Sequence, residues 1–197
     1  MSNVKVLAIS ASLHPSSVSR AALVALRSEI TKLDANYELV DLASEEWSLP
    51  LFDPRRKSSP AAYEKIKALM LSSHAVVLAS PDYHGGASGV MKNCLDYFWG
   101  EFAGRLFGYV CASHEKGLTV MEQMRTSVRQ CYGWSLPYGL SLSESDLNAE
   151  RTEITNAKVS SRVQLMAHDL CTYGPLLYDR FAMDKSKPGQ GFAAIYK

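Results

Sequence analysis

Apolar residues recur with two different periods along most of the chain. Five short apolar runs have the length and β-branched content of strands, and the continuous run 75–80 is typical of a strand covered on both faces. These runs are residues 4–10, 37–42, 75–80, 106–113 and 134–142. Between them, helical spacing extends over residues 17–33, 60–73, 89–99, 117–133 and 148–172. The pattern predicts strands and helices in regular alternation.

Local signals agree with these bounds. Pro60 suits the first turn of its helix, and Ser88 is a plausible N-cap for the helix that begins at residue 89. Gly133 would fit a left-handed cap after the helix 117–133. Pro137 and Gly139 weaken the fifth strand.

Strand–helix alternation repeated five times predicts an α/β fold, in which a parallel sheet carries helices on both faces. Ligands of such sheets bind beyond the carboxyl ends of the strands, where the strand order reverses. We therefore examine the loops that follow the first, third and fourth strands.

The chain has 197 residues, enough for one domain with a sizeable core. Its composition is 47% hydrophobic and 21% charged with a formal net charge of +1, which calls for neither nucleic acid nor membrane as a partner. The apolar runs are far shorter than the roughly 20 residues needed to cross a bilayer. The N-terminal residues lack the features of a signal peptide, so a cytoplasmic location is expected.

Cysteine and histidine spacing predicts no disulfide framework and no metal site. The four cysteines form no CxxC pair, which is typical of buried, reduced thiols. The five histidines show no HExxH or other metal-ligand spacing.

The first loop, "SASLHPSSVSR" at 10–20, places several hydroxyls before a helix. Hydroxyl donors, loop N–H groups and the helix dipole together make a phosphate site, to which His14 and Arg20 could add charge. The alternative is that Ser17 or Ser19 merely caps the helix and the rest is a solvated turn; spacing alone does not decide between them. Neither GxGxxG nor GxxxxGK[ST] occurs in the chain.

The second and third loops offer features that suit a flat heterocycle. In "SPDYHGG" at 80–86, Pro81 fixes the backbone, the glycines allow close approach, and Tyr83 provides a flat face. An ordinary connection with an exposed Tyr83 and His84 is the alternative. The loop "ASHEKG" at 112–117 adds Ser113 and His114 at the same edge.

Three segments resemble the flavodoxin-like NADPH-dependent FMN reductases, which include quinone, azo and chromate reductases. "SASLHPSSVSR" is similar to the pattern G-S-L-R-x-x-S-x-N-R, and "SPDYHGGASGVMKNCLDYF" resembles T-P-E-Y-N-x-x-x-P-G-x-L-K-N-x-[IL]-D-W-[LF]. "LPLFD" at 49–53 is like the segment after the second strand. The resemblance covers about residues 4–135. It implies a three-layer sandwich with a five-stranded parallel sheet of order 2-1-3-4-5.

Carried over by position, the resemblance implies an FMN site. The phosphate would be surrounded by Ser12, His14, Ser17 and Ser19. The isoalloxazine would be lined by Pro81, Asp82, Tyr83, His84 and Gly85, with Ser113 beneath its pyrimidine end. The resemblance implies no catalytic side chain, because the flavin itself carries the redox chemistry.

The chain departs from the family pattern at several of these positions. Ala11 stands in place of glycine, Ser19 and His84 in place of asparagine, and Asp82 in place of glutamate. His14 replaces an arginine, and histidine is only partly charged near neutral pH. This replacement predicts tighter FMN binding at pH 6 than at pH 8.

The resemblance implies an FMN-dependent oxidoreductase. It would pass hydride from NADPH or NADH through FMN to a small-molecule acceptor, such as a quinone, an azo compound, a metal or a flavin. A flavodoxin-like electron carrier without reductase activity is the alternative, although such carriers are usually strongly acidic. A homodimer or homotetramer is expected. We predict a domain over residues 1–173 and a C-terminal extension over 174–197, whose aromatics would either wrap a partner subunit or pack on their own chain.

Overall fold

The fold is described by a computed structural model for residues 4–187, 189 and 191–196. Residues 188, 190 and 197, which belong to the predicted C-terminal extension, lie outside the described residues. The strands are β1 (Lys5–Ser10), β2 (Asn36–Asp41), β3 (Ala75–Tyr83), β4 (Gly86–Ala87), β5 (Leu106–Ala112), β6 (Trp134–Ser135) and β7 (Leu140–Leu142). The α-helices are α1 (Val18–Lys32), α2 (Ala61–Ser72), α3 (Gly89–Asp96), α4 (Leu118–Gln130) and α5 (Ala157–Lys185). Four short 3₁₀ helices are η1 (Glu45–Trp47), η2 (Gly100–Phe102), η3 (Glu144–Asp146) and η4 (Phe192–Tyr196).

The main sheet is parallel and has the order β2-β1-β3-β5-β6, with β7 also paired to β5. The two-residue β4 lies off this path and pairs antiparallel with the end of β3. Because β4 is an extra piece, β5 and β6 correspond to the fourth and fifth predicted strands. The predicted order 2-1-3-4-5 is therefore confirmed.

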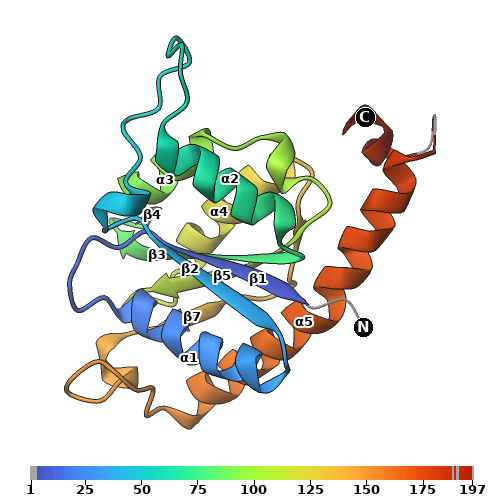
Figure 1. The fold of residues 1–197 in the computed structure, drawn as a ribbon. Helices are drawn as coiled ribbons and strands as arrows, with labels where there is room; N and C mark the ends of the chain where they lie inside the picture. The colour runs from blue at the N-terminus through green and yellow to red at the C-terminus, as the bar shows by residue number, and fades with distance from the viewer. Residues whose placement is uncertain (1–3, 188, 190, 197) are drawn as a thin grey trace.

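Helices cover both faces of the sheet (Figure 1), with α1 and α5 on one side and α2, α3 and α4 on the other. Successive strand residues point to opposite layers: Leu7 and Ile9 pack toward α2–α4, and Val6 and Ala8 pack toward α1 and α5. Both faces are thus apolar, which explains the continuous runs that mark these strands.

The predicted fifth strand is interrupted. Its two ends form β6 and β7, and the residues between them leave the ladder. Pro137 has no N–H to donate, and a side chain at Gly139 would collide with the sulfur of Met121.

The end of α4 differs from the expectation for Gly133. The left-handed residue is Tyr132, with φ 60°, and the helix stops at Gln130. Position 133 instead has no room for a side chain, because a Cβ there would collide with the Val128 side chain.

The predicted bounds of the last helix, 148–172, are wrong at both ends. Asn148 forms local bonds that compete with a helix, because its Oδ1 accepts from the N–H groups of Thr152 (2.8 Å) and Glu153 (3.1 Å). The helix begins only after Asn156, whose side chain accepts from the N–H of Lys158 at 3.0 Å. It then continues through Pro175 to Lys185.

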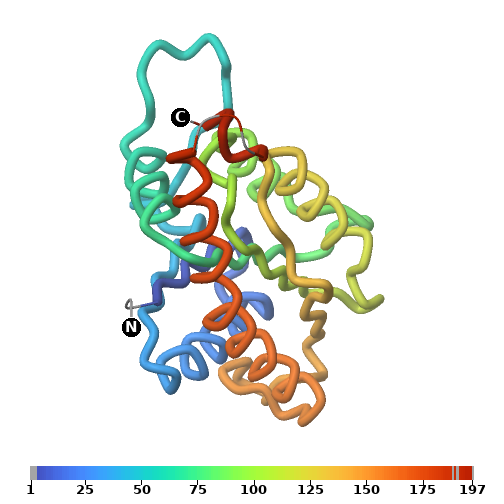
Figure 2. Tube along the Cα trace, turned by 90° about the vertical axis from the view of Figure 1, so that its right-hand side faces the viewer, coloured from blue at the N-terminus to red at the C-terminus, as the bar shows by residue number. Residues whose placement is uncertain are grey.

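Tertiary packing carries α5 past Pro175. The hydroxyl of Tyr178 donates to the carbonyl of Leu71 at 3.3 Å, so this part of the helix is fixed to the end of α2. Figure 2 shows the last residues turning back against the body of the molecule. There Phe192 stacks on Tyr132, with ring centroids 5.5 Å apart. The described residues of the tail thus pack on their own chain. The predicted boundary between residues 173 and 174 falls inside α5. Dimerisation stays a prediction.

All four cysteines are free, and burial raises the pKa of both Cys94 and Cys111 to about 12. Within the described residues, no helix combines the length and apolarity needed to span a bilayer.

Ser88 ties two of the candidate loops together. This buried residue caps α3 by accepting from the N–H of Met91 at 3.1 Å, and its hydroxyl donates to the carbonyl of Ala11 at 2.8 Å. Its own N–H donates to the hydroxyl of Ser80 at 2.9 Å. One side chain therefore joins the loops that follow β1 and β3.

We expect Ser88→Ala to lower the free energy of unfolding by about 2 kcal/mol, because it removes a helix cap and leaves a buried carbonyl unpaired. Urea denaturation measures this change. Ser161→Ala, which removes only an exposed bond within α5 (2.9 Å), is the matched control and should change stability by less than about 0.5 kcal/mol. Equal effects of the two substitutions would contradict the role given to Ser88.

Candidate functional site

A cavity of about 700 Å³ lies at the carboxyl edge of the sheet, within the size range of small-molecule sites. The structure brings all ten residues predicted from the sequence together around it. They are Ser12, His14, Ser17, Ser19, Pro81, Asp82, Tyr83, His84, Gly85 and Ser113. The loops after β1, β3 and β5 therefore meet at one place.

The first loop presents hydrogen-bond donors at the start of α1. Ser17 caps the helix, accepting from the N–H of Arg20 at 3.2 Å, yet it also lines the cavity. The hydroxyls of Ser17 and Ser19 lie 3.1 Å apart and are buried, as is Ser12. In the described part of the chain, the N–H groups of Val18 and Ser19 meet no acceptor. Hydroxyls, free N–H groups and a helix dipole at one place favour an anion.

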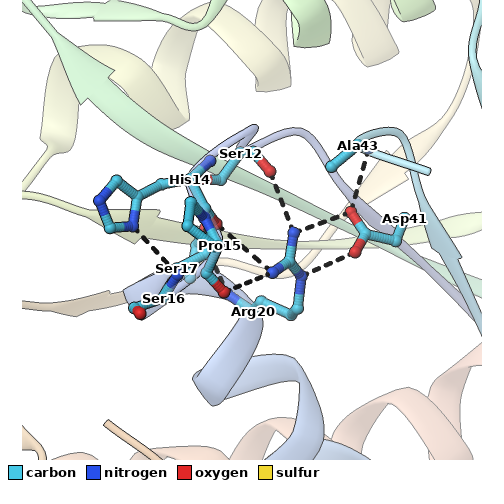
Figure 3. Close-up of polar contacts among 9 residues, drawn as sticks. Ser12, His14, Pro15, Ser16, Ser17, Arg20, Asp41 and Ala43 are labelled. Atoms are coloured by element: carbon cyan, nitrogen blue, oxygen red, sulfur yellow. Dashed lines mark hydrogen bonds and ion pairs between the residues drawn. The ribbon is translucent and has the colours of Figure 1, made fainter.

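Arg20 holds this loop from behind (Figure 3). Its guanidinium donates to the carbonyls of Ser12 (3.3 Å), His14 (3.4 Å) and Pro15 (3.1 Å). It also pairs with both carboxylate oxygens of Asp41 at the end of β2, at 2.8 and 3.1 Å. Arg20 does not line the cavity, so the expectation that it could add charge there is wrong. Its role is to fix the loop's shape.

His14 is held by its own loop. Its Nδ1 accepts from the N–H of Ser16 at 3.1 Å, so Nε2 carries the proton of the neutral ring. This bond fixes the orientation of the imidazole ring within the loop.

Asp82 connects the second loop to the third. One carboxylate oxygen accepts from the N–H of Gly85 and the other from the hydroxyl of Ser113, both at 2.8 Å. Ser113 in turn accepts from the N–H of Glu115 at 3.0 Å. Through these hydrogen bonds, Asp82 holds the second and third loops in position relative to each other.

The turn after β3 leaves an aromatic face open. His84 and Gly85 both have left-handed φ values, 57° and 77°, which allows the short pairing of β3 with β4. Tyr83 is 54% exposed at the cavity wall. A planar ligand can reach its ring.

The third loop depends on Gly117. This residue has φ 58°, and a Cβ there would collide with the sulfur of Cys111. Only glycine therefore fits this position, and the turn that it makes places the start of α4 beside the cavity.

The sequence analysis missed a fourth contribution, from the segment after β7. Arg151 lines the cavity, where its guanidinium donates to the carbonyl of Ser16 at 3.2 Å and pairs with Glu144 at 2.7 Å. Arg151 has φ 55°, which no sequence pattern indicated. Only the predicted fold could have indicated this contribution, because the segment follows the fifth strand and therefore lies at the same edge of the sheet as the other loops. The remaining lining residues are Ser16, Val18, Ala112, His114, Glu115, Leu118, Thr119, Ser143 and Glu144.

Comparison with known proteins gives the family. The profile described as NADPH-dependent FMN reductase matches residues 4–146, more than half of the chain. The chain belongs to this family. An NADPH azoreductase of Bacillus sp. (strain OY1-2) is 34% identical over 104 residues. That alignment covers 51% of this chain and 57% of the azoreductase, so the chain spans little more than half of this relative's length.

Two solved structures with the same fold are a flavoenzyme and an NADH:FMN oxidoreductase. The flavoenzyme NAD(P)H:(acceptor) oxidoreductase FerB of Paracoccus denitrificans superposes with a TM-score of 0.73 at 15% identity, covering 88% of this chain and 98% of that one. An NADH:FMN oxidoreductase, EMOB, in its apo form gives a TM-score of 0.67 at 17% identity and covers 86% and 89%. At these identities the likeness concerns the fold.

Family membership implies FMN as cofactor and NAD(P)H as electron donor. The residues present fit FMN. Buried hydroxyls and unpaired N–H groups stand at one end of the cavity, where a phosphate requires donors, and Tyr83, the last residue of β3, offers an exposed aromatic face at the cavity wall.

We expect Arg20→Gln to loosen the first loop, because three carbonyl contacts and the pair with Asp41 are lost together. Hydrogen–deuterium exchange of the bonded N–H groups of His14 and Ser16 in the segment 12–19 should become about tenfold faster or more, a change equivalent to about 1.4 kcal/mol of local stability. Arg129→Gln, which changes the same charge on an exposed position of α4, should leave that segment unaffected. Unchanged exchange in Arg20→Gln would contradict the role assigned to this arginine.

Proposed function

We propose that this protein is an FMN-dependent NAD(P)H oxidoreductase that passes electrons to a small-molecule acceptor, such as a quinone, an azo compound, a metal or a flavin. The observation that carries the proposal is the single cavity lined by all ten residues of the family-like motifs. Family membership supports the same conclusion.

Under this proposal the phosphate of FMN is held by the first loop. Ser12, Ser17 and Ser19 supply hydroxyls, and the first turn of α1 supplies free N–H groups and its dipole. Arg151, which also pairs with Glu144 at 2.7 Å, adds a guanidinium beside Ser16, at the end of the cavity where this chain has His14 in place of the family's arginine. Arginine always carries its charge, so it is the better phosphate ligand of the two.

The isoalloxazine would be held at the other end by Tyr83, the backbone of residues 82–85 and Ser113. Asp82 keeps Gly85 and Ser113 in position through its two 2.8 Å hydrogen bonds. FMN bound here would supply the redox chemistry that links NAD(P)H to the acceptor. The chain's own tasks are to bind, to orient and to exclude water, and these tasks require no catalytic side chain.

The function is tested by titrating the purified protein with FMN and then adding NADPH under anaerobic conditions. We expect saturable binding, followed by loss of the flavin's visible absorption. FMN binding without reduction by NADPH or NADH would favour the electron carrier instead. Absence of FMN binding would contradict the proposal outright.

The role of Arg151 is tested by comparing FMN with riboflavin, which lacks the phosphate. Arg151→Gln should weaken FMN binding by roughly 10- to 100-fold, equivalent to the 1.5–3 kcal/mol of a hydrogen bond to a charged group. Riboflavin binding should be unchanged, and Arg129→Gln should leave both ligands unaffected. Equal weakening of both ligands would show that Arg151 acts on loop structure and not on the phosphate.

FMN is expected to bind more tightly at pH 6 than at pH 8, because histidine gains charge as the pH falls over this range. The expected change in the dissociation constant between these two pH values is about tenfold or less. His14→Ala should abolish it. Dissociation constants at both pH values measure the effect, and a pH dependence that survives in His14→Ala would contradict this origin.

A further inference from the structure

A second cavity of about 610 Å³ adjoins the first, and Leu118 lines both. Its walls come from one face of α4, from residues 137–139 and the start of β7, and from the first turns of α5. Residues 112–119 of the first cavity form the end at which we place the flavin ring. A ligand that reaches the ring beside Leu118 can therefore extend into the second cavity.

The second cavity is strongly basic. Its lining contains four cationic side chains, Lys116, Arg125, Lys158 and Arg162, and one acidic side chain, Glu122. The formal charge of the lining is thus +3, whereas the whole chain carries only +1. A hollow lined by one sign of charge concentrates ligands of the opposite sign.

Three of the four cations are available to a ligand. Arg125 is paired with Glu122 and lies over the ring of Tyr109. Among the described residues, no carboxylate forms an ion pair with Lys116, Lys158 or Arg162.

Arg162 is also held in place. Its guanidinium lies 4.8 Å from the centroid of the Tyr138 ring, and its Nε donates to the carbonyl of Gly139 at 3.3 Å. A guanidinium fixed in this way loses little freedom when it binds an oxyanion, and its terminal nitrogens remain as donors.

We propose that this second cavity binds phosphate groups of the dinucleotide electron donor, above all the 2′-phosphate of NADPH. The inference rests on the proposed function, because it is the nicotinamide's need to reach the flavin that brings the dinucleotide to Leu118. Phosphate oxygens match the chemistry of Lys116, Lys158 and Arg162. NADPH should therefore be preferred to NADH. A sulfonate on an anionic acceptor has similar charge and geometry, and the experiment separates the two sources.

The test measures binding of adenosine 2′,5′-bisphosphate and of adenosine 5′-monophosphate by calorimetry, with the protein both free of FMN and saturated with it. We expect the bisphosphate to bind more tightly. In the double variant Lys158→Gln/Arg162→Gln, its affinity should fall by about tenfold or more, whereas that of the monophosphate should change by less than about threefold. The Michaelis constant for NADPH should rise with little change in that for NADH.

The controls separate binding from folding. Lys158 lies in the first turn of α5, near the positive end of the helix dipole, so removing its charge should not destabilise the helix. Arg162→Lys keeps the charge and should recover part of the affinity. Lys57→Gln, on an exposed loop away from both cavities, should behave as the original chain does.

Several results would overturn the proposal. One is equal affinity for the two adenosine phosphates; another is a double variant that binds the bisphosphate normally. If naphthalene sulfonate loses affinity in the double variant while the bisphosphate does not bind at all, the site serves an anionic acceptor and the dinucleotide assignment is wrong. Failure to bind FMN would instead overturn the proposed function, and the FMN-free titrations distinguish that failure from this one.

Discussion

Three parallel strands buried on both faces, β1, β3 and β5, determine where this protein can bind a ligand. Their carboxyl ends share one edge of the sheet, so the loops that follow them must meet there. Ser88 then joins two of these loops with one buried hydroxyl, and Asp82 joins the second to the third. The cavity is a consequence of this arrangement, and its walls are held by hydrogen bonds between loops that are distant in sequence.

Charge around the first cavity is distributed differently from what the motifs alone indicate. Arg20, within the family-like motif, faces Asp41 and the loop carbonyls, where it has a structural task. His14 is bonded through Nδ1 to its own loop. The guanidinium that does reach the cavity is Arg151, which comes from beyond the recognisable part of the chain. We propose that Arg151 compensates in this way for the replacement of the family's arginine by His14, although the two positions are more than a hundred residues apart.

The apolar period was enough to predict the parallel sheet. Its strand order and the ten lining residues came from the resemblance to a known family, which the motifs of the first two loops carry. Neither the period nor the resemblance could predict the fourth loop. Asn148 looks acceptable at the start of a helix, and only its bonds to the N–H groups of Thr152 and Glu153 reveal a turn. The extent of α5 past Pro175 was equally hidden, since it depends on contacts such as that of Tyr178 with Leu71. Local signals fail where partners distant in sequence decide the structure.

The most direct test of the account is a crystal structure of the protein with FMN. The account predicts the phosphate between the hydroxyls of Ser12 and Ser17 and the guanidinium of Arg151, with the ring beside Tyr83 and above Ser113. FMN bound elsewhere, or in the reverse direction with its phosphate at the loop 112–117, would contradict it.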